Sequence, residues 1–186
     1  IYERYVLKNI DGLIFPCLKN GVHPFAGQCR HVATVNNVPV LAETYDCYDP
    51  AVKKETGSIC HVGSLTYTRG ITHLVKAAAQ ADCTLYLGGA FSPAAYQDEV
   101  LSLPEAAHTR YMGVLNRAQV MQLLQKSQIG MATILNVGQY NQYDNLATKV
   151  YEYMALGIPV ILSRSSYNEK VTAQSAFGIC VDPANV

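Results

Sequence analysis

The 186-residue sequence carries little charge, and what it carries is balanced. Lys and Arg number 14, Asp and Glu number 14, and charged residues make up only 15% of the chain. A groove for nucleic acid or a polybasic membrane face needs an excess of Lys and Arg. The composition therefore argues against nucleic acid as a partner, and any bound anion must be held by a few placed groups.

Paired cysteines and long apolar runs are missing as well. No stretch approaches the roughly 20 uninterrupted apolar residues of a spanning helix, and no basic and apolar signal pattern opens the chain. The cysteines lie far apart without a Cys-x-x-Cys pair, which argues against a zinc knuckle or a compact disulfide framework. They are Cys17, Cys29, Cys47, Cys60, Cys83 and Cys180. We expect a cytoplasmic protein whose thiols are reduced and mostly buried.

The histidines form no metal-binding spacing. Neither His-x-x-x-His nor His-Glu-x-x-His occurs, and no Asp-x-Asp element is present. Metal sites built on sequence motifs use such spacings. The sequence therefore predicts no metal site, and we expect His61 and His108, in or beside strands, to be core groups with satisfied ring nitrogens.

From residue 58 onward, short apolar runs alternate with amphipathic stretches. The pattern predicts strands at 59–62, 84–87, 110–112, 129–135, 159–162 and 178–181, and helices at 69–81, 94–103, 117–126, 145–156 and 167–176. Alternating strands and helices are typical of an α/β fold, a Rossmann-like parallel sheet flanked by helices.

The start of the chain is organised differently. A helix-like opening precedes expected strands at 12–15 and 31–35, and residues 41–57 show no clear period. We interpret 1–40 as the trailing end of a preceding domain, 41–57 as a linker, and 58–186 as the Rossmann-like domain. Because the chain begins at Ile1 without Met and stops after an apparent strand, we expect an excerpt of a longer protein.

Glycines follow the predicted strands. Gly63, Gly88, Gly89 and Gly113 all fall at strand ends, on the carboxyl edge where open α/β sheets bind ligands and where glycine lets a backbone approach closely.

The stretch from Asp144 to Ile161 is the most informative part of the sequence. Beside an apolar stripe, Asn145, Thr148, Lys149 and Glu152 recur at helical spacing on a second face. The predicted helix follows a strand's carboxyl end, where free N–H groups and the helix dipole favour a phosphate.

Two motifs carry a family resemblance. Val62-Gly63-Ser64-Leu65 with Arg69-Gly70-Ile71 and Lys149-Val-Tyr-Glu152-Tyr-Met-Ala with Gly157-Ile-Pro-Val resemble the C-terminal, donor-binding domain of family 4 (group 1) glycosyltransferases of GT-B fold. The resemblance covers 58–185, and residues 1–40 resemble the end of the acceptor domain of such enzymes.

The resemblance implies roles for particular residues. Asp144 would contact the transferred sugar, Glu152 would accept hydrogen bonds from the ribose hydroxyls, and Arg69 with Lys149 would neutralise the diphosphate. Ser64 stands where the family usually has a second cation. The remaining implied contacts to the sugar nucleotide are from Gly63, Gly88, Arg117, Asn145 and Thr148.

Each of these residues also has a purely structural interpretation. Asp144 can cap its helix, Arg69 can pair with a surface acid, and Arg117, Lys149 and Glu152 can be solvated surface groups.

As an activity, the resemblance implies a retaining, metal-independent glycosyltransferase without a cofactor, whose substrate is a nucleoside-diphosphate sugar. Its acceptor would be a glycan or lipid-linked, in bacterial cell-envelope polysaccharide synthesis, with peripheral association of the full-length protein at the inner membrane face. Two alternatives stay open: a sugar-nucleotide epimerase of GT-B architecture, and a nucleotide- or carbohydrate-binding module without catalysis. With the intact enzyme, free epimerised sugar nucleotide formed without an acceptor would indicate the first, and tight nucleotide binding while no acceptor is ever glycosylated would indicate the second.

Overall fold

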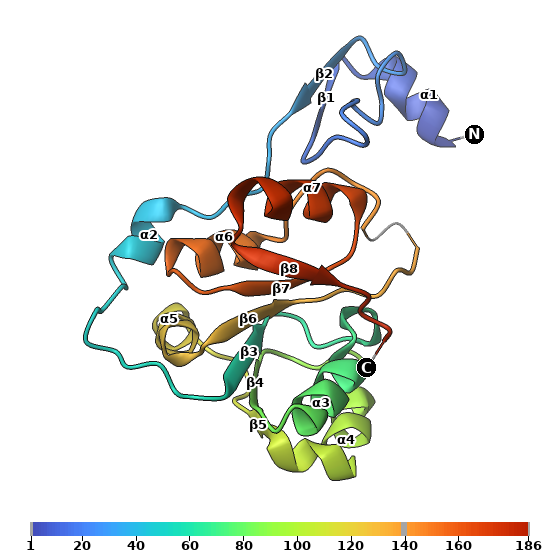
Figure 1. Ribbon diagram of the computed structural model, residues 1–186. Helices are drawn as coiled ribbons and strands as arrows, with labels where there is room; N and C mark the ends of the chain where they lie inside the picture. The colour runs from blue at the N-terminus through green and yellow to red at the C-terminus, as the bar shows by residue number, and fades with distance from the viewer. Residues whose placement is uncertain (1, 139–140, 186) are drawn as a thin grey trace.

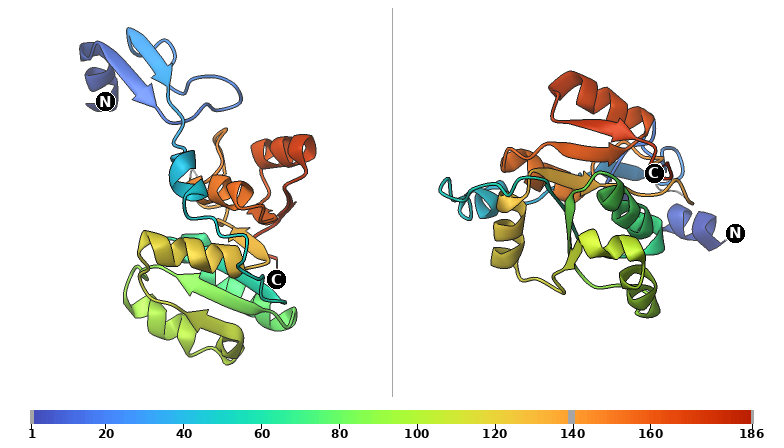
Figure 2. Two further views of the ribbon diagram at one scale, coloured as in Figure 1. Left: turned by 90° about the vertical axis from the view of Figure 1, so that its left-hand side faces the viewer. Right: turned by 60° about the horizontal axis from the view of Figure 1, so that its bottom comes forward.

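The computed structural model describes residues 2–138 and 141–185. It begins with a small unit, drawn in blue at the top of Figure 1, in which α1 (Tyr2–Asn9) precedes the parallel strands β1 (Gly12–Phe15) and β2 (His31–Thr34). A single connecting segment leads from this N-terminal unit to the body of the molecule, as the left view of Figure 2 shows.

The body is built on a six-stranded sheet of order β5-β4-β3-β6-β7-β8, in which all strands are parallel. Its strands are β3 (Ser58–Val62), β4 (Thr84–Gly88), β5 (Thr109–Tyr111), β6 (Ile129–Ala132), β7 (Val160–Ser163) and β8 (Gly178–Val181). The chain moves outward from β3 to β5 and then returns to β6 on the other side of β3. The order therefore reverses between β3 and β6, which is the topological switch point of a doubly wound sheet.

Helices cover both faces of this sheet. They are α2 (Leu41–Tyr45), α3 (Ile71–Gln80), α4 (Ala95–Leu101), α5 (Arg117–Lys126), α6 (Thr148–Ala155) and α7 (Ser166–Ser175), with 3-10 turns η1 (Tyr67–Arg69) and η2 (Pro104–His108). The short α2 lies beside α6 (Figure 1). The Rossmann-like architecture expected from the sequence is confirmed.

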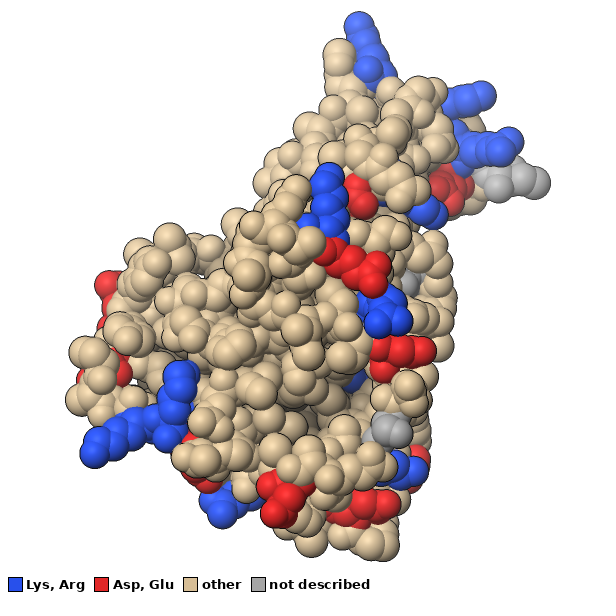
Figure 3. Space-filling view, viewed as in Figure 1, with Lys and Arg blue, Asp and Glu red and all other residues tan. Residues whose placement is uncertain are grey.

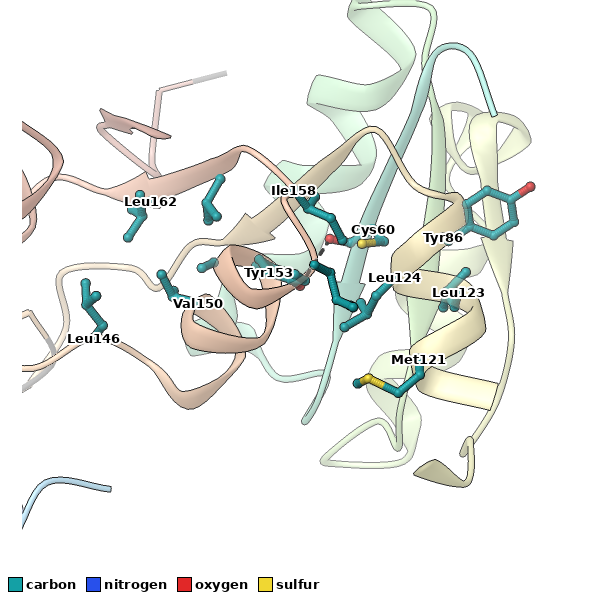
Figure 4. Packing of buried hydrophobic residues seen from close by; sticks show 13 residues of the cluster. Cys60, Tyr86, Met121, Leu123, Leu124, Leu146, Val150, Tyr153, Ile158 and Leu162 are labelled. Carbon is teal, nitrogen blue, oxygen red and sulfur yellow. Dashed lines mark hydrogen bonds between the residues drawn. The ribbon is translucent and has the colours of Figure 1, made fainter. Parts of the chain in front are cut away.

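Two hydrophobic clusters form the core, one on each face of the sheet. Successive strand residues alternate between them: Ile59 belongs to the α3 and α4 side, and Cys60 to the α5 and α6 side. In the second cluster (Figure 4), the Tyr153 hydroxyl lies 3.5 Å from the Cys60 carbonyl oxygen. Because both faces are covered, the central strands read as continuous apolar runs.

One glycine decides how closely α6 approaches the sheet. A Cβ built at Gly130 would lie 2.5 Å from Cδ2 of the Tyr153 ring, and Tyr153 is fully buried. Only a residue without a side chain lets the ring lie flat against β6.

Several sequence expectations need correction. The helix expected at 145–156 begins only at Thr148, because the backbone N–H of Asp144 donates to the Leu18 carbonyl (2.7 Å) and holds this segment extended. The strand expected at 129–135 ends at Ala132. The segment 41–57 contains α2, whose Thr44 is buried. Among the cysteines, all free, only Cys17 and Cys60 are buried and the other four are half-buried, so the expectation of mostly buried thiols was wrong.

The surface follows the balanced composition. On the face in Figure 3, positive and negative side chains are interspersed along the edges and the middle is nearly free of charge. Within residues 2–138 and 141–185, no helix has the length and apolar character to cross a membrane.

Candidate functional site

A cleft of about 470 Å³ lies at the carboxyl edge of the sheet, beside the switch point. The body contributes η1, the segment after β6, and the starts of α6 and α7 to its walls. The N-terminal unit and the residues after it contribute Phe15, Cys17, Asn36 and Asn37. Among the described residues that line the cleft, Arg69 and Lys149 are the charged ones. The site is therefore positive, although the molecule as a whole is neutral.

Lys149 lies in the first turn of α6. The N-cap residue of this helix, Ala147, has no side chain that could cap it, so the N–H groups of the first turn remain available to an anion. The Lys149 ammonium extends to the end of β3, where Nζ lies 3.2 Å from His61 Nε2 and 3.3 Å from the position of a Cβ built at Gly63. Glycine at 63 thus leaves room for the ammonium.

His61 is completely buried in β3, and both of its ring nitrogens have partners. Nδ1 lies 3.1 Å from the Met131 carbonyl oxygen. A carbonyl only accepts hydrogen bonds, so Nδ1 carries the hydrogen and Nε2 accepts from Lys149. Burial and the nearby Lys149 charge hold the pKa of His61 well below its usual range. The imidazole is therefore a neutral acceptor, and the expectation of a satisfied core histidine is confirmed for His61. For His108 that expectation was wrong: its side chain is half-exposed and lies 3.7 Å from Asp82 at the surface.

The electrostatics of Lys149 are equally distinctive. Burial, followed by repulsion from Arg69, lowers the pKa of the Lys149 ammonium to about 7. Arg69 is the last residue of η1. The next residue, Gly70, has a φ of 67° and is the N-cap of α3. Two cationic side chains thus approach the switch point from opposite sides of the sheet. An anion that carries more than one negative charge would relieve the repulsion between these two cations.

The glycine loops run side by side at this edge. Gly63 N donates to the Gly88 carbonyl (2.9 Å), and a Cβ at Gly89 (φ 141°) would lie 1.8 Å from the Gly63 oxygen. Gly88 packs against Leu115, whose Cδ1 would be 2.9 Å from a Cβ there. Ser64 follows Gly63 in the exposed loop after β3. This edge is closed to larger side chains and presents backbone.

Glu152 and Arg117 form an ion pair outside the cleft lining. The Glu152 side chain is 14% exposed, and Arg117 Nη1 donates to it. Arg117 also donates to the Thr44 hydroxyl at 3.3 Å. Arg117 opens α5 behind Asn116, which forms a capping box with Gln119. Glu152 lies on the same helix as Lys149, one turn further along, and Arg117 reaches it from α5.

Asp144 is placed differently from the sequence expectation. It lies in an extended segment before α6 and does not cap the helix; its carboxylate accepts from the Gly21 backbone N–H at 2.5 Å. The neighbouring Tyr143 ring contacts Phe15, with centroids 5.7 Å apart. Asp144 therefore joins the N-terminal unit to the body in this structure.

The structure thus brings together Arg69, Lys149, Thr148 and Asn145 along the cleft, with Gly63 against the ammonium. Asp144, Gly88, Arg117 and Glu152 are outside its lining. Sequence reasoning missed the contact of His61 with Lys149 and the contribution of Asn36 and Asn37. The sequence did contain one signal for His61: it is a polar residue near the carboxyl end of a buried strand, two positions before Gly63.

Metal-binding groups do not gather anywhere in the part of the chain that the structure describes: no cluster of three or more His, Cys, Asp or Glu side chains is found there. The prediction that catalysis uses no metal remains a prediction.

A doubly wound parallel sheet with a cationic cleft at its switch point defines a Rossmann-like α/β domain, an architecture that binds its ligands at the carboxyl edge of the sheet. The chain belongs to the family of glycosyl transferases group 1, whose model matches residues 49–186. The match includes the end of the segment interpreted as a linker. No curated protein sequence matches the chain.

Solved structures share the fold. The chain is similar to a sucrose-phosphate synthase from Thermosynechococcus elongatus, with TM-score 0.64, 19% identity, and coverage of 98% of this chain and 48% of the other. WaaG, a glycosyltransferase of lipopolysaccharide biosynthesis, gives TM-score 0.63 at 14% identity, covering 91% and 48%. Anabaena Alr3699/HepE in complex with UDP gives 0.58 at 15%, covering 82% and 44%. The chain spans less than half the length of these structures.

Proposed function

We propose that this chain is the donor-binding part of a retaining, metal-independent glycosyltransferase that uses a nucleoside-diphosphate sugar. The observation that carries the proposal is the approach of Arg69 and Lys149 to the start of α6 at the switch point. Two cations and the N–H groups of an uncapped helix start match the charge of a diphosphate.

The same groups account for catalysis. When the glycosidic bond of the donor breaks, negative charge develops on the leaving diphosphate, and the Arg69 guanidinium and the Lys149 ammonium stabilise it electrostatically. The glycine loops at Gly63 and Gly89 let the phosphates approach the backbone. This chemistry needs charge rather than a metal ion, and retention of configuration is the expectation taken from the family resemblance.

For the rest of the donor, we propose that Glu152 binds the ribose hydroxyls. The nucleotide would displace Arg117, whose guanidinium donates to the Glu152 carboxylate in this structure, and the ribose hydroxyls would donate in its place. Asp144 is proposed to contact the sugar only once Gly21 has released its carboxylate. Gly88, Ser64, Asn145 and Thr148 would complete the contacts.

The acceptor is proposed to be a glycan or a lipid-linked glycan in cell-envelope polysaccharide synthesis, at the cytoplasmic side of the membrane. The similarity to WaaG, a glycosyltransferase involved in lipopolysaccharide biosynthesis, supports this part of the proposal.

Calorimetry with UDP, GDP and ADP tests the proposal, UDP first because a similar structure holds it. We expect Arg69→Ala to lower affinity for the preferred nucleoside diphosphate at least about tenfold, and to leave weak binding of the parent nucleoside, followed by NMR, unchanged. Arg30→Ala, an exposed arginine in the N-terminal unit, is the matched control. Equal weakening of both ligands, or no binding of any nucleotide by the folded chain, would overturn the proposal.

A further inference from the structure

The His61 side chain is connected to two parts of the molecule at once. Its Nδ1 donates to the Met131 carbonyl of β6 (3.1 Å), and its Nε2 lies 3.2 Å from Lys149 Nζ of α6. The bond to Met131 fixes the tautomer and the plane of the ring. A fixed ring then fixes the direction in which Nε2 can accept.

We infer that His61 is a positioning residue for Lys149, whose ammonium it holds over the β3 and β6 switch point by a hydrogen bond from Nζ to Nε2. The inference rests on the proposed function, because it assigns the held ammonium to the diphosphate of the donor.

A neutral acceptor is suited to this task. A carboxylate at position 61 would also hold the ammonium, but it would cancel the charge that the diphosphate needs and compete with it. Imidazole in the tautomer that the bond to the Met131 carbonyl requires holds Lys149 without neutralising it. The lysine stem is flexible, and ordering it costs rotamer entropy that a bound ligand would otherwise have to offset. With His61 present, that ordering precedes ligand binding.

The surroundings restrict Lys149 to this position. Gly63 has no side chain, and a Cβ built there would lie only 3.3 Å from Lys149 Nζ. The charges that act on the ammonium include Arg69, which repels it, and Glu152, which attracts it from one turn along α6. Neither of these holds it over β3, so the bond to His61 sets its place.

Two substitutions at position 61 separate this role from a structural one. Asparagine places an amide nitrogen near the position of Nδ1, and so can keep the bond to Met131 while it loses the acceptor for Lys149. Glutamine places an amide oxygen near the position of Nε2, and so can keep the acceptor for Lys149.

With UDP as probe, or the diphosphate preferred in the nucleotide panel, we expect His61→Gln to stay within about threefold of the wild-type affinity and His61→Asn to lose about tenfold. Urea denaturation of each variant checks that the comparison is made on folded protein. His108→Asn, at a half-exposed histidine near Asp82, is the matched control and should bind as wild type.

A double-mutant cycle completes the test. Once Lys149→Met has removed the ammonium, adding His61→Asn should lower the affinity no further. Equal affinities of the two His61 variants, or an additional loss in the double variant, would overturn the positioning role even if Lys149→Met and Arg69→Ala weaken binding. If those two variants bind UDP as tightly as wild type, it is the proposed diphosphate site that fails.

Discussion

At the scale of single residues, the burial of the Lys149 ammonium at the proposed site lowers the stability of the fold. Its pKa falls from 10.5 to about 7 because the ammonium is buried beside Arg69. The folded chain thus holds this proton less firmly than the unfolded chain, which is a cost to folding in the absence of an anion.

We expect this cost to appear as a pH dependence of stability. Between pH 7 and 10.5 the unfolded chain binds the Lys149 proton that the folded chain has lost, so the free energy of unfolding rises with pH in that range. Lys149→Met removes this contribution. Urea denaturation under reducing conditions measures the free energy of unfolding of both proteins. The value for Lys149→Met minus the value for wild type should be about 1–3 kcal/mol larger at pH 7 than at pH 9.5. The exposed Lys170→Met is the control, and parallel pH profiles of wild type and Lys149→Met would contradict the assignment.

We expect the same proton to govern the affinity for the proposed donor. A diphosphate prefers the charged ammonium, and the pKa of Lys149 is about 7, so affinity should fall roughly tenfold between pH 6.5 and 8.5. A sugar nucleotide is the appropriate probe, because its doubly esterified diphosphate has no group that titrates near pH 6. Calorimetry in buffers of different ionisation enthalpy should detect proton uptake on binding at pH 8. Lys149→Met should abolish both effects, and a wild-type affinity constant over this range would contradict the prediction.

Glu152 provides a third prediction at this scale. We expect Glu152→Ala to lower nucleoside diphosphate affinity about tenfold, because a carboxylate that accepts from ribose hydroxyls contributes on the order of 1.5–3 kcal/mol per bond, shared over one acceptor group. Glu169→Ala is a matched control, since Glu169 is also paired with an arginine, Arg164, at 3.2 Å.

The ligand offers a second control for Glu152. A 2′-deoxy nucleotide should bind wild type more weakly than the ribonucleotide and should bind Glu152→Ala equally with it. Persistent discrimination by Glu152→Ala would assign the ribose to other residues.

At the scale of elements, the approach of α6 to β6 determines where the cleft lies. Gly130 and Tyr153 set this distance, and α6 carries Thr148, Lys149 and Glu152 on its polar side. A substitution at Gly130 therefore disturbs the packing of the core directly, and it displaces the residues of the cleft only by moving α6.

We expect Gly130→Ala to lower the free energy of unfolding by about 1–3 kcal/mol, because its Cβ would overlap the buried Tyr153 ring. Gly12→Ala, where a Cβ meets its nearest neighbour at an ordinary 3.6 Å, should change stability little by comparison. Chemical denaturation measures both. Equal denaturation midpoints for the two variants would show that α6 can move away from β6 without cost.

At the scale of the whole molecule, the proposed donor site belongs to one lobe, whereas the proposed sugar transfer would need a second lobe to close over it and exclude water. The chain matches less than half the length of the similar structures. Its first 40 residues build a small unit and the start of the connecting segment, and contribute Phe15, Cys17, Asn36 and Asn37 to the cleft.

The 186-residue chain should therefore bind a sugar nucleotide without transferring the sugar. We expect a Kd of roughly 10 μM to 1 mM, about −4 to −7 kcal/mol, since only one lobe contributes burial. Calorimetry with the sugar nucleotide and chromatography of a reaction with candidate acceptors measure the two quantities. A glycosylated acceptor made by these residues alone would refute the two-lobe interpretation.

The sequence by itself determined the alternation of strands and helices. A strand buried on both faces is a short apolar run and a covering helix is an amphipathic stretch, so each can be recognised from its own residues. It also placed Arg69, Thr148 and Lys149 beside a sheet edge, since motif and strand end lie close together in the chain. Only the tertiary structure decided that Asp144 pairs with Gly21, that Glu152 pairs with Arg117, and that Lys149 reaches His61. These partners are separated by 123, 35 and 88 residues, and side-chain contacts over such distances depend on how the elements pack rather than on any local pattern.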